Sequence, residues 1–159
     1  MEVKPFEAIV REHGAVVLRV CRAVLGPDDA EDAWSETFLS ALRAYPSLDP
    51  AANVQAWLVT IAKRKAIDSR RAAARRPVTV PDLPEAAGGA DPGPGEHDGL
   101  WAALRMLPQR QREALAYHHL AGLPFADVAL LLESTEAACR RSAADGMKKL
   151  RSLDVEDLR

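Results

Sequence analysis

The stretch from Asn53 to Arg71, NVQAWLVTIAKRKAIDSRR, separates into two faces when it is read at helical spacing. One face is apolar and consists of Val54, Leu58, Ile61, Ala62 and Ala66. The opposite face, which we call the basic face, consists of Thr60, Lys63, Arg64, Ile67, Arg70 and Arg71. We therefore expect a helix that buries one side and presents positive charge on the other.

The basic face has two interpretations. Four positive charges on one helix, with Trp57 near its start and Arg75 and Arg76 just beyond, suit contact with the phosphates and bases of nucleic acid. A charged helix face that is merely solvated would show the same pattern. The remainder of the chain has to decide between the two.

The composition indicates an all-α protein with segregated charge. A chain of 159 residues that is 48% hydrophobic can bury a core, as one or two small domains. It is rich in Ala, Leu, Arg and Glu and poor in aromatic residues, which favours helices throughout. The net charge is only -2, yet Lys63 to Arg76 holds seven cations and one acid, whereas Asp28 to Glu36 holds five acids and no cation.

Several classes of protein are disfavoured by what the sequence lacks. Cys21 and Cys139 lie far apart without a CxxC or Cys/His cluster, so neither a disulfide framework nor a metal site is expected. His118 and His119 have no acid or nucleophile at ligand spacing, and the phosphate-binding glycine loop, HExxH and nucleophile elbow are all missing. We expect no catalytic residue, no enzyme activity and no cofactor.

Membrane insertion is not expected either. The N-terminal residues do not form a basic start followed by an apolar run, and no segment approaches the roughly 18 apolar residues of a membrane span. The sequence therefore predicts a cytoplasmic protein.

The segment from Pro77 to Gly99 differs from the rest of the chain. It contains five of the eleven prolines, five of the nine glycines and five acids, but no Lys or Arg. Such a composition cannot pack a core and predicts a flexible linker, which would reach about 70 Å in polyproline form. We expect two helical domains, residues 1–76 and 100–159, that are tethered rather than fused.

Three helices are expected before the linker. The first runs from about Pro5 to Leu25 and stops at Gly26-Pro27. The second begins near Asp28 or Asp29, and the third is the basic helix with Asn53 as its N-cap. The apolar side of the second helix comprises Ala30, Ala33, Trp34, Thr37, Phe38, Ala41, Leu42 and Tyr45.

The segment after the linker predicts a helix-turn-helix. Helices are expected at Leu100–Leu107, Gln109–Leu120, Pro124–Leu132 and Thr135–Leu153. Only Glu133-Ser134 separates the last two, which is the short connection of that motif. The apolar residues of this pair should face each other and leave more exposed Arg140, Arg141, Ala144, Lys148 and Arg151. An ordinary helical hairpin with a charged outer face is the alternative.

With these residues in place, the chain resembles the extracytoplasmic-function (ECF) sigma factors of bacterial RNA polymerase. Four blocks carry the resemblance, in the expected order: Ala30–Phe38 (AEDAWSETF), Ala56–Arg71 (AWLVTIAKRKAIDSRR), Leu107–Ala114 (LPQRQREA) and Gly122–Ala129 (GLPFADVA). Together with the linker they cover nearly the whole chain. Four matching blocks are far more specific than any one of them.

The resemblance implies a sigma region 2 domain before the linker and a region 4 domain after it. It implies that the acidic helix binds the clamp helices of the largest subunit of core RNA polymerase, through Asp32, Ser35, Glu36, Leu39 and Arg43. It implies that the basic helix reads and melts the -10 promoter element, through Asn53, Trp57, Lys63, Arg64, Ile67, Arg70 and Arg71. It implies that the last helix reads the -35 element, through Thr135, Arg140, Arg141 and Lys148.

The chain departs from the family pattern at several of these positions. Ser35 stands where the family usually has Gln, Arg64 where Asn is common, and Glu133 where the turn often has Gly. The recognition helix reads Glu136-Ala-Ala-Cys-Arg-Arg rather than a run of the Thr-Val-Lys-Ser-Arg type. The function expected from the resemblance is promoter-specific transcription initiation with core RNA polymerase.

Three other functions are kept beside this one. The family also admits an anti-sigma factor as a partner, so the chain could be a sigma mimic that titrates such a protein. A free-standing helix-turn-helix repressor would leave the N-terminal domain unexplained. A small hydrolase is the most distant, for want of a nucleophile constellation.

Overall fold

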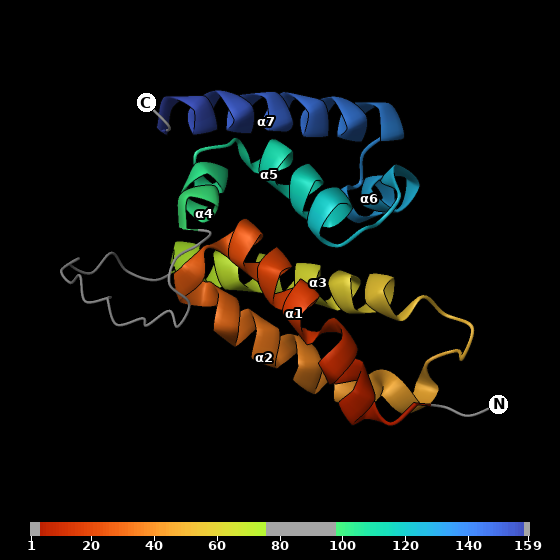
Figure 1. Cartoon of the computed structure of the whole chain (residues 1–159). Coiled ribbons are helices and arrows are strands. Elements are labelled where there is room, and N and C mark those ends of the chain that lie inside the picture. The colour runs from red at the N-terminus through yellow and green to blue at the C-terminus, as the bar shows by residue number, and fades with distance from the viewer. Residues whose placement is uncertain (1–3, 76–97, 158–159) are drawn as a thin grey trace.

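The computed structural model describes residues 4–75 and 98–157, and the described part is helical without any strand (Figure 1). The predicted linker lies outside the described residues except at its end, where helix α4 already begins at Asp98. Arg76 also lies outside them. The all-α prediction is confirmed.

Three long helices form the first half of the molecule: α1 (Phe6–Leu25), α2 (Pro27–Ala44) and α3 (Val54–Arg75). A short 3-10 turn (Tyr45–Ser47) follows α2. Gly26 separates α1 from α2 with a φ of 90°, and Pro27 opens α2 in the first turn, where proline costs no hydrogen bond. These bounds agree with the sequence prediction to within two residues, except that α3 extends four residues further.

The second half contains α4 (Asp98–Arg105), α5 (Gln109–Leu115), the π-helical turn η3 (Ala116–Leu120), α6 (Phe125–Leu132) and α7 (Glu136–Asp157). The expected helix from Gln109 to Leu120 is thus an α-helix that ends in a π turn. Arg112 donates to the carbonyl oxygens of Leu104, Arg105 and Leu107, at 3.1, 3.4 and 2.8 Å. It thereby adds a side-chain donor to the carbonyl end of α4 and to the turn that follows it, where the oxygen of Leu104 also accepts the N–H of Leu107 at 3.1 Å.

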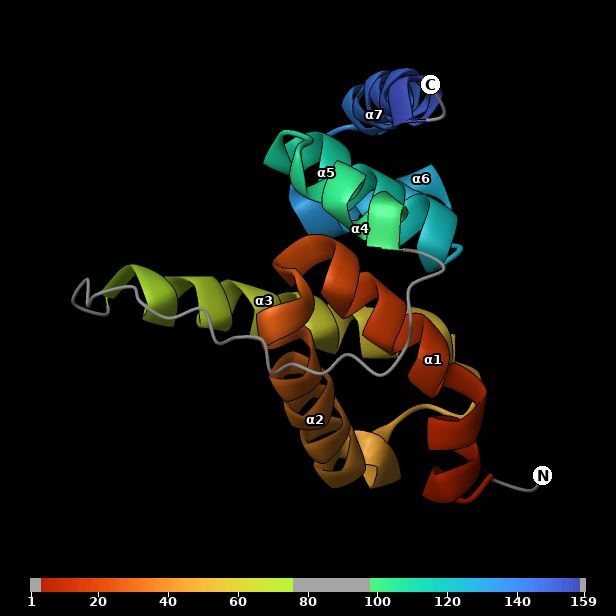
Figure 2. The same ribbon diagram turned by 60° about the vertical axis from the view of Figure 1, so that its left-hand side comes forward.

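Two apolar clusters hold the helices together. The first-domain core lies among α1, α2 and α3 and comprises Ile9, Val17, Cys21, Ala30, Ala33, Phe38, Ala41, Leu58, Ile61 and Ala62. The shared core joins Val20, Ala23 and Val24 of α1 and Val59 and Ala66 of α3 to residues of α4 to α7, such as Leu107, Tyr117 and Val128. The two halves therefore pack against each other, as both views show (Figures 1 and 2). This packing was not predicted from the sequence.

One expectation about the buried faces is wrong, and another is confirmed although the residue lies in a different core. Leu42, expected on the apolar side of α2, is 51% exposed, because that side is already filled by the small and aromatic residues around it. Ala66 is buried, but in the shared core rather than with Leu58 and Ile61 in the first-domain core. Helix α3 buries two sides, one against each half of the molecule.

Candidate nucleic-acid interface

The basic face of α3 is divided by the packing of the second half. Arg64 and Arg71 are exposed and form no side-chain hydrogen bond or ion pair with another described residue. Lys63 and Arg70 are half-buried instead, because they contact Leu131 and Glu113 of the second half. Only part of the predicted cationic surface is therefore open in this arrangement.

The other side chains predicted to contact the -10 element occupy varied positions. Asn53 caps α3: its Oδ1 accepts the backbone N–H of Ala56 at 3.1 Å, as the sequence predicted for an N-cap. Trp57 and Ile67 are half-buried, and the ring of Trp57 lies 6.3 Å from that of Tyr45. Trp57 keeps one side open, since it lines a groove of about 330 Å³ between α3 and α6.

The predicted polymerase-binding residues lie together on α2. They recur at helical spacing and are all exposed, forming what we call the α2 stripe: Asp32, Ser35, Glu36, Leu39 and Arg43. Leu39 is 54% exposed, and the equally exposed Leu42 beside it was missed by the sequence reasoning. Two exposed leucines on one helix are an unusual surface for a chain to leave in water, and they favour a protein partner.

Lys65 is a further residue that sequence reasoning missed. Its Nζ lies 3.9 Å from Glu36 Oε1, so a cation of α3 forms an ion pair with an acid of α2. The sequence did contain an indication of this contact, because Lys65 directly follows Arg64 and lies at the border of the basic face.

The helix-turn-helix has the predicted geometry. Val128 and Ala129 of α6 and Cys139 and Ala143 of α7 are buried together, while the five residues expected to be exposed on α7 are all exposed. Glu133 makes the turn in the left-handed conformation, at φ 52° and ψ 52°. The outer surface of α7 is thus exposed at Arg140, Arg141, Ala144, Lys148 and Arg151.

The side chains predicted to read the -35 element are not equivalent. Arg141 and Lys148 are exposed and without a described partner. Arg140 donates to Glu136 Oε1 at 3.2 Å and lies over the Phe125 ring, 5.0 Å from its centroid. Thr135 is the N-cap of α7, because its Oγ1 accepts the N–H of Ala138 at 3.1 Å.

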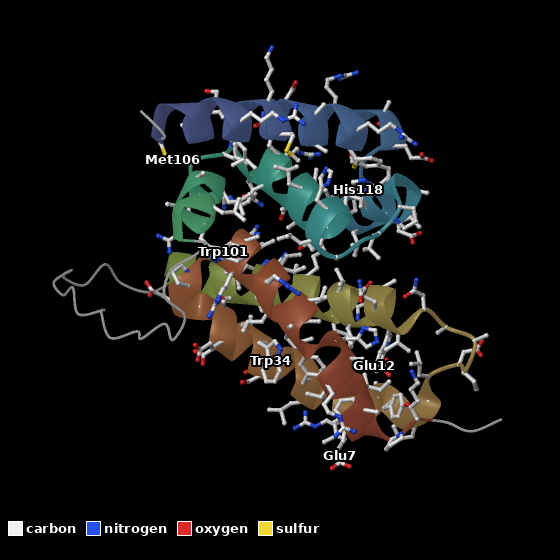
Figure 3. The ribbon with its side chains drawn as sticks, viewed as in Figure 1. Glu7, Glu12, Trp34, Trp101, Met106 and His118 are labelled. Carbon is white, nitrogen blue, oxygen red and sulfur yellow. The ribbon has the colours of Figure 1, made fainter. Side chains whose placement is uncertain are left out.

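The paired histidines have a structural role, and Figure 3 labels His118, which lies in the second half beneath α7. The His118 ring stacks on Phe125 with 3.8 Å between centroids, and its Nδ1 lies 2.8 Å from the carbonyl oxygen of Leu123. Burial lowers the pKa of His119, and His118 adds to that shift. Within the described residues, no group of three or more His, Cys, Asp or Glu side chains could hold a metal ion.

The described helices include none that is both long and apolar enough to span a bilayer.

Together, the three-helix half with its cationic helix and the helix-turn-helix half define a two-part nucleic-acid-binding protein. Comparison with known proteins places it more closely. The family model of sigma-70 region 2 matches residues 9–76, and that of sigma-70 region 4 matches residues 97–150.

Two curated relatives show the same relationship. The RNA polymerase sigma factor CarQ of Myxococcus xanthus is 33% identical over 130 residues, which cover 78% of this chain and 74% of CarQ. The ECF RNA polymerase sigma factor SigJ of Mycobacterium tuberculosis is 34% identical over 161 residues. That match covers 93% of this chain and 49% of SigJ, so the chain spans about half the length of that relative.

Solved structures share the fold. The sigma factor RpoE of Bartonella quintana, solved with the anti-sigma factor NepR, has a TM-score of 0.69 at 22% identity and covers 92% of this chain and 96% of its own. CnrH, solved with the cytosolic domain of CnrY, has a TM-score of 0.65 at 22% identity, covering 96% and 88%. The chain belongs to the ECF sigma factors, and the predicted family is confirmed. It is a sigma factor of RNA polymerase, a class that is not enzymatic.

Proposed function

We propose that this sigma factor binds core polymerase and the two promoter elements through three separate surfaces. The α2 stripe binds the clamp helices of core RNA polymerase, the basic face of α3 binds the -10 element during melting, and the outer side of α7 binds the -35 element as duplex. The chain acts in the cytoplasm, where the polymerase is.

The observation that carries this proposal is the pattern of exposed cations. Arg64 and Arg71 on α3, and Arg141 and Lys148 on α7, are open to solvent in a chain of net charge -2. Side chains of this kind hold phosphates, while a helix in the major groove reads base edges. Trp57 adds a stacking surface at the open side of α3, which suits unpaired bases.

The experiment is promoter-dependent transcription with purified core polymerase. Reversing the charge of both Arg64 and Arg71 should lower open-complex formation roughly tenfold while core binding stays intact, because these side chains lie outside the α2 stripe. Arg19→Glu, an exposed cation of α1 outside the three surfaces, is the matched control. Equal losses in the double variant and in Arg19→Glu would contradict the assignment of α3.

The polymerase surface is tested separately. Leu39→Asp should abolish co-purification with core polymerase, since it introduces a charge at the apolar centre of the α2 stripe. Met106→Asp is the control, because Met106 is an exposed apolar side chain outside the proposed surfaces, at 65% exposure. Retained core binding in Leu39→Asp would overturn the α2 assignment.

We also infer that an anti-sigma protein regulates the chain, because the similarly folded RpoE of Bartonella quintana was solved with one. The groove between α3 and α6, which includes the 79% exposed Leu130, is an apolar surface that such a protein could cover. Addition of the anti-sigma protein to the transcription assay should stop initiation and slow hydrogen exchange along the groove. Undiminished transcription at saturating concentration would rule the protein out as a regulator.

A further inference from the structure

An aromatic group of side chains supports Arg140 near the beginning of α7. The ring of His118, in η3, stacks on that of Phe125 with 3.8 Å between centroids and 17° between planes. Arg140 Cζ lies 5.0 Å from the centroid of the same phenyl ring, within the roughly 6 Å over which a guanidinium is attracted to an aromatic face. Phe125 therefore contacts side chains of both η3 and α7.

Glu136 provides a second contact for the same guanidinium. Arg140 Nη2 donates to Glu136 Oε1 at 3.2 Å, across one turn of α7. Such a pair on a helix surface is weak by itself, because two long side chains must lose rotamer freedom to form it. The phenyl ring of Phe125 restrains the guanidinium independently of that pair. Arg140 is therefore held in one geometry before any ligand binds.

The restrained pair still offers its polar atoms to a ligand. The side chains of Arg140 and Glu136 are 62% and 51% exposed. A guanidinium has five N–H donors, and within the described residues Arg140 uses only one of its two Nη atoms for a hydrogen bond. Glu136 Oε2 accepts no hydrogen bond from a described residue. The pair thus presents a fork of donors beside a free acceptor.

Donors beside an acceptor match the major-groove edge of a G·C base pair. Guanine presents two acceptors there, O6 and N7, and its cytosine partner presents the N4 amino group as a donor. An arginine binds the two guanine atoms with its fork, and a carboxylate accepts from cytosine N4. Glu136 is the first residue of α7, and Arg140 follows one turn later. In a helix-turn-helix, this N-terminal part of the second helix contacts base edges.

We propose that Arg140 and Glu136 together read one G·C pair of the -35 element, and that Phe125, backed by His118, is the positioning residue for the guanidinium. Arg140 donates to guanine O6 and N7, while Glu136 accepts from cytosine N4. This inference rests on the proposed function, which places the outer side of α7 against duplex DNA. It adds the base pair that is read and the side chains that set the preference.

The base preference is tested with holoenzyme, that is, core polymerase with the full chain. Promoter fragments randomised through the -35 region are bound, recovered and sequenced. Wild type should enrich a G·C pair at one position, and Arg140→Ala and Glu136→Ala should each reduce that enrichment about tenfold at this position alone. Arg110→Ala, at an exposed arginine of α5 outside the three surfaces, should leave it unchanged. An unchanged preference in Arg140→Ala or Glu136→Ala would overturn the reading pair.

The positioning role of Phe125 is tested in the same selection. Phe125→Leu keeps an apolar side chain but removes the flat ring, so it should weaken the same preference about threefold, because Arg140 then loses its rotamer freedom only on binding. Phe125→Tyr keeps the ring and should select as wild type does. A loss in Phe125→Leu that is spread evenly over the -35 positions, or no loss at all, would overturn the positioning role.

The same selection separates failure of this inference from failure of the proposed function. Fragments recovered by wild type with no preferred sequence in the -35 region would overturn the assignment of α7 to that element, and the reading pair with it. A preferred sequence that does not depend on Arg140 would overturn the pair alone.

Nuclear magnetic resonance of the free full chain measures the support of Arg140 without DNA. A guanidinium over a phenyl face lies in the shielding region of the ring, so the side-chain proton signals of Arg140 should be shifted upfield in wild type. The shift should persist in Phe125→Tyr and disappear in Phe125→Leu. Identical Arg140 signals in wild type and Phe125→Leu would overturn the positioning role.

Discussion

Glu133 adopts a backbone conformation that favours glycine, since its φ is 52° between α6 and α7. We predict that Glu133→Gly raises the free energy of unfolding by about 1 kcal/mol, because relief of the left-handed conformation outweighs the added flexibility of the unfolded chain. Glu133→Ala, which removes the same carboxylate but keeps a Cβ, should not stabilise. Chemical denaturation measures both, and equal stabilisation by Ala would point to the charge instead.

Cys21 is a buried thiol whose chemistry should be suppressed. Burial raises its pKa from 9.0 to about 12, so its thiolate fraction at pH 8 falls about a thousandfold. The pKa of the Cys21 thiol is higher in the folded chain than in the unfolded chain, so the protonated thiol favours the folded state. This stabilisation is complete below pH 9 and is lost as the pH rises through about 12. Alkylation followed by mass spectrometry should find Cys21 unmodified in the native chain and modified in urea. Similar rates in both states would contradict its burial.

At single residues, the sequence predicted what depends on neighbours in the chain. Asn53 was expected to cap α3, and it does, because capping needs only the next helical turn. Thr135, which is predicted to contact DNA, also caps α7 with its hydroxyl, a contact with the next turn that the prediction did not include. The pairing of Arg70 with Glu113 could not be foreseen, because 43 residues separate them and only the packing of the halves joins them.

The crossing of α5 and α7 depends on a glycine. A Cβ at Gly146 would lie 2.8 Å from Leu115 Cδ1 and 3.2 Å from Gln111 Cβ. We predict that Gly146→Ala lowers stability by about 1–2 kcal/mol, because overpacking exceeds the gain of about 1 kcal/mol in helix propensity. Thermal unfolding measures the change.

Gly14 in α1 is the matched control. A Cβ there would meet Trp34 Cζ2 at 3.5 Å, an ordinary contact. Gly14→Ala should therefore stabilise by about 0.5–1 kcal/mol through helix propensity alone. If both alanines had effects of the same sign, close packing at Gly146 would not be the cause.

At the level of elements, amphipathic spacing was enough to predict every described α-helix, since each has an apolar side. It did not predict the π turn at Ala116–Leu120, because one inserted residue leaves the apolar spacing almost unchanged. Nor did it predict that α3 is buried on two sides. Alanine and valine fit either core, so Val59 and Ala66 gave no sign of which half they would contact.

At the scale of the whole molecule, the shared core predicts that the stabilities of the two halves are coupled. The sequence predicted a division into two helical units, and the matches to regions 2 and 4 cover residues 9–76 and 97–150. It predicted a tether between them because the linker composition cannot pack a core. What it could not provide is the contact between the halves, which arises from side chains that each half would otherwise expose.

Substitutions at two adjacent residues of α3 test this coupling. Leu58 and Val59 are both fully buried, Leu58 in the first-domain core and Val59 in the shared core. Truncation to alanine should cost roughly 2–5 kcal/mol at Leu58 and roughly 1–3 kcal/mol at Val59. The location of the effect, rather than its size, distinguishes the two sites.

Hydrogen exchange along the chain gives that location. Val59→Ala should speed amide exchange in α5 as well as α3, because Val59 belongs to the same core as residues of the second half such as Leu115. Leu58→Ala should speed exchange chiefly in α1, α2 and α3, whose side chains surround it. If Val59→Ala left α5 as protected as in wild type, the halves would be independent in solution, and their packing could not hold Lys63 and Arg70 against Leu131 and Glu113.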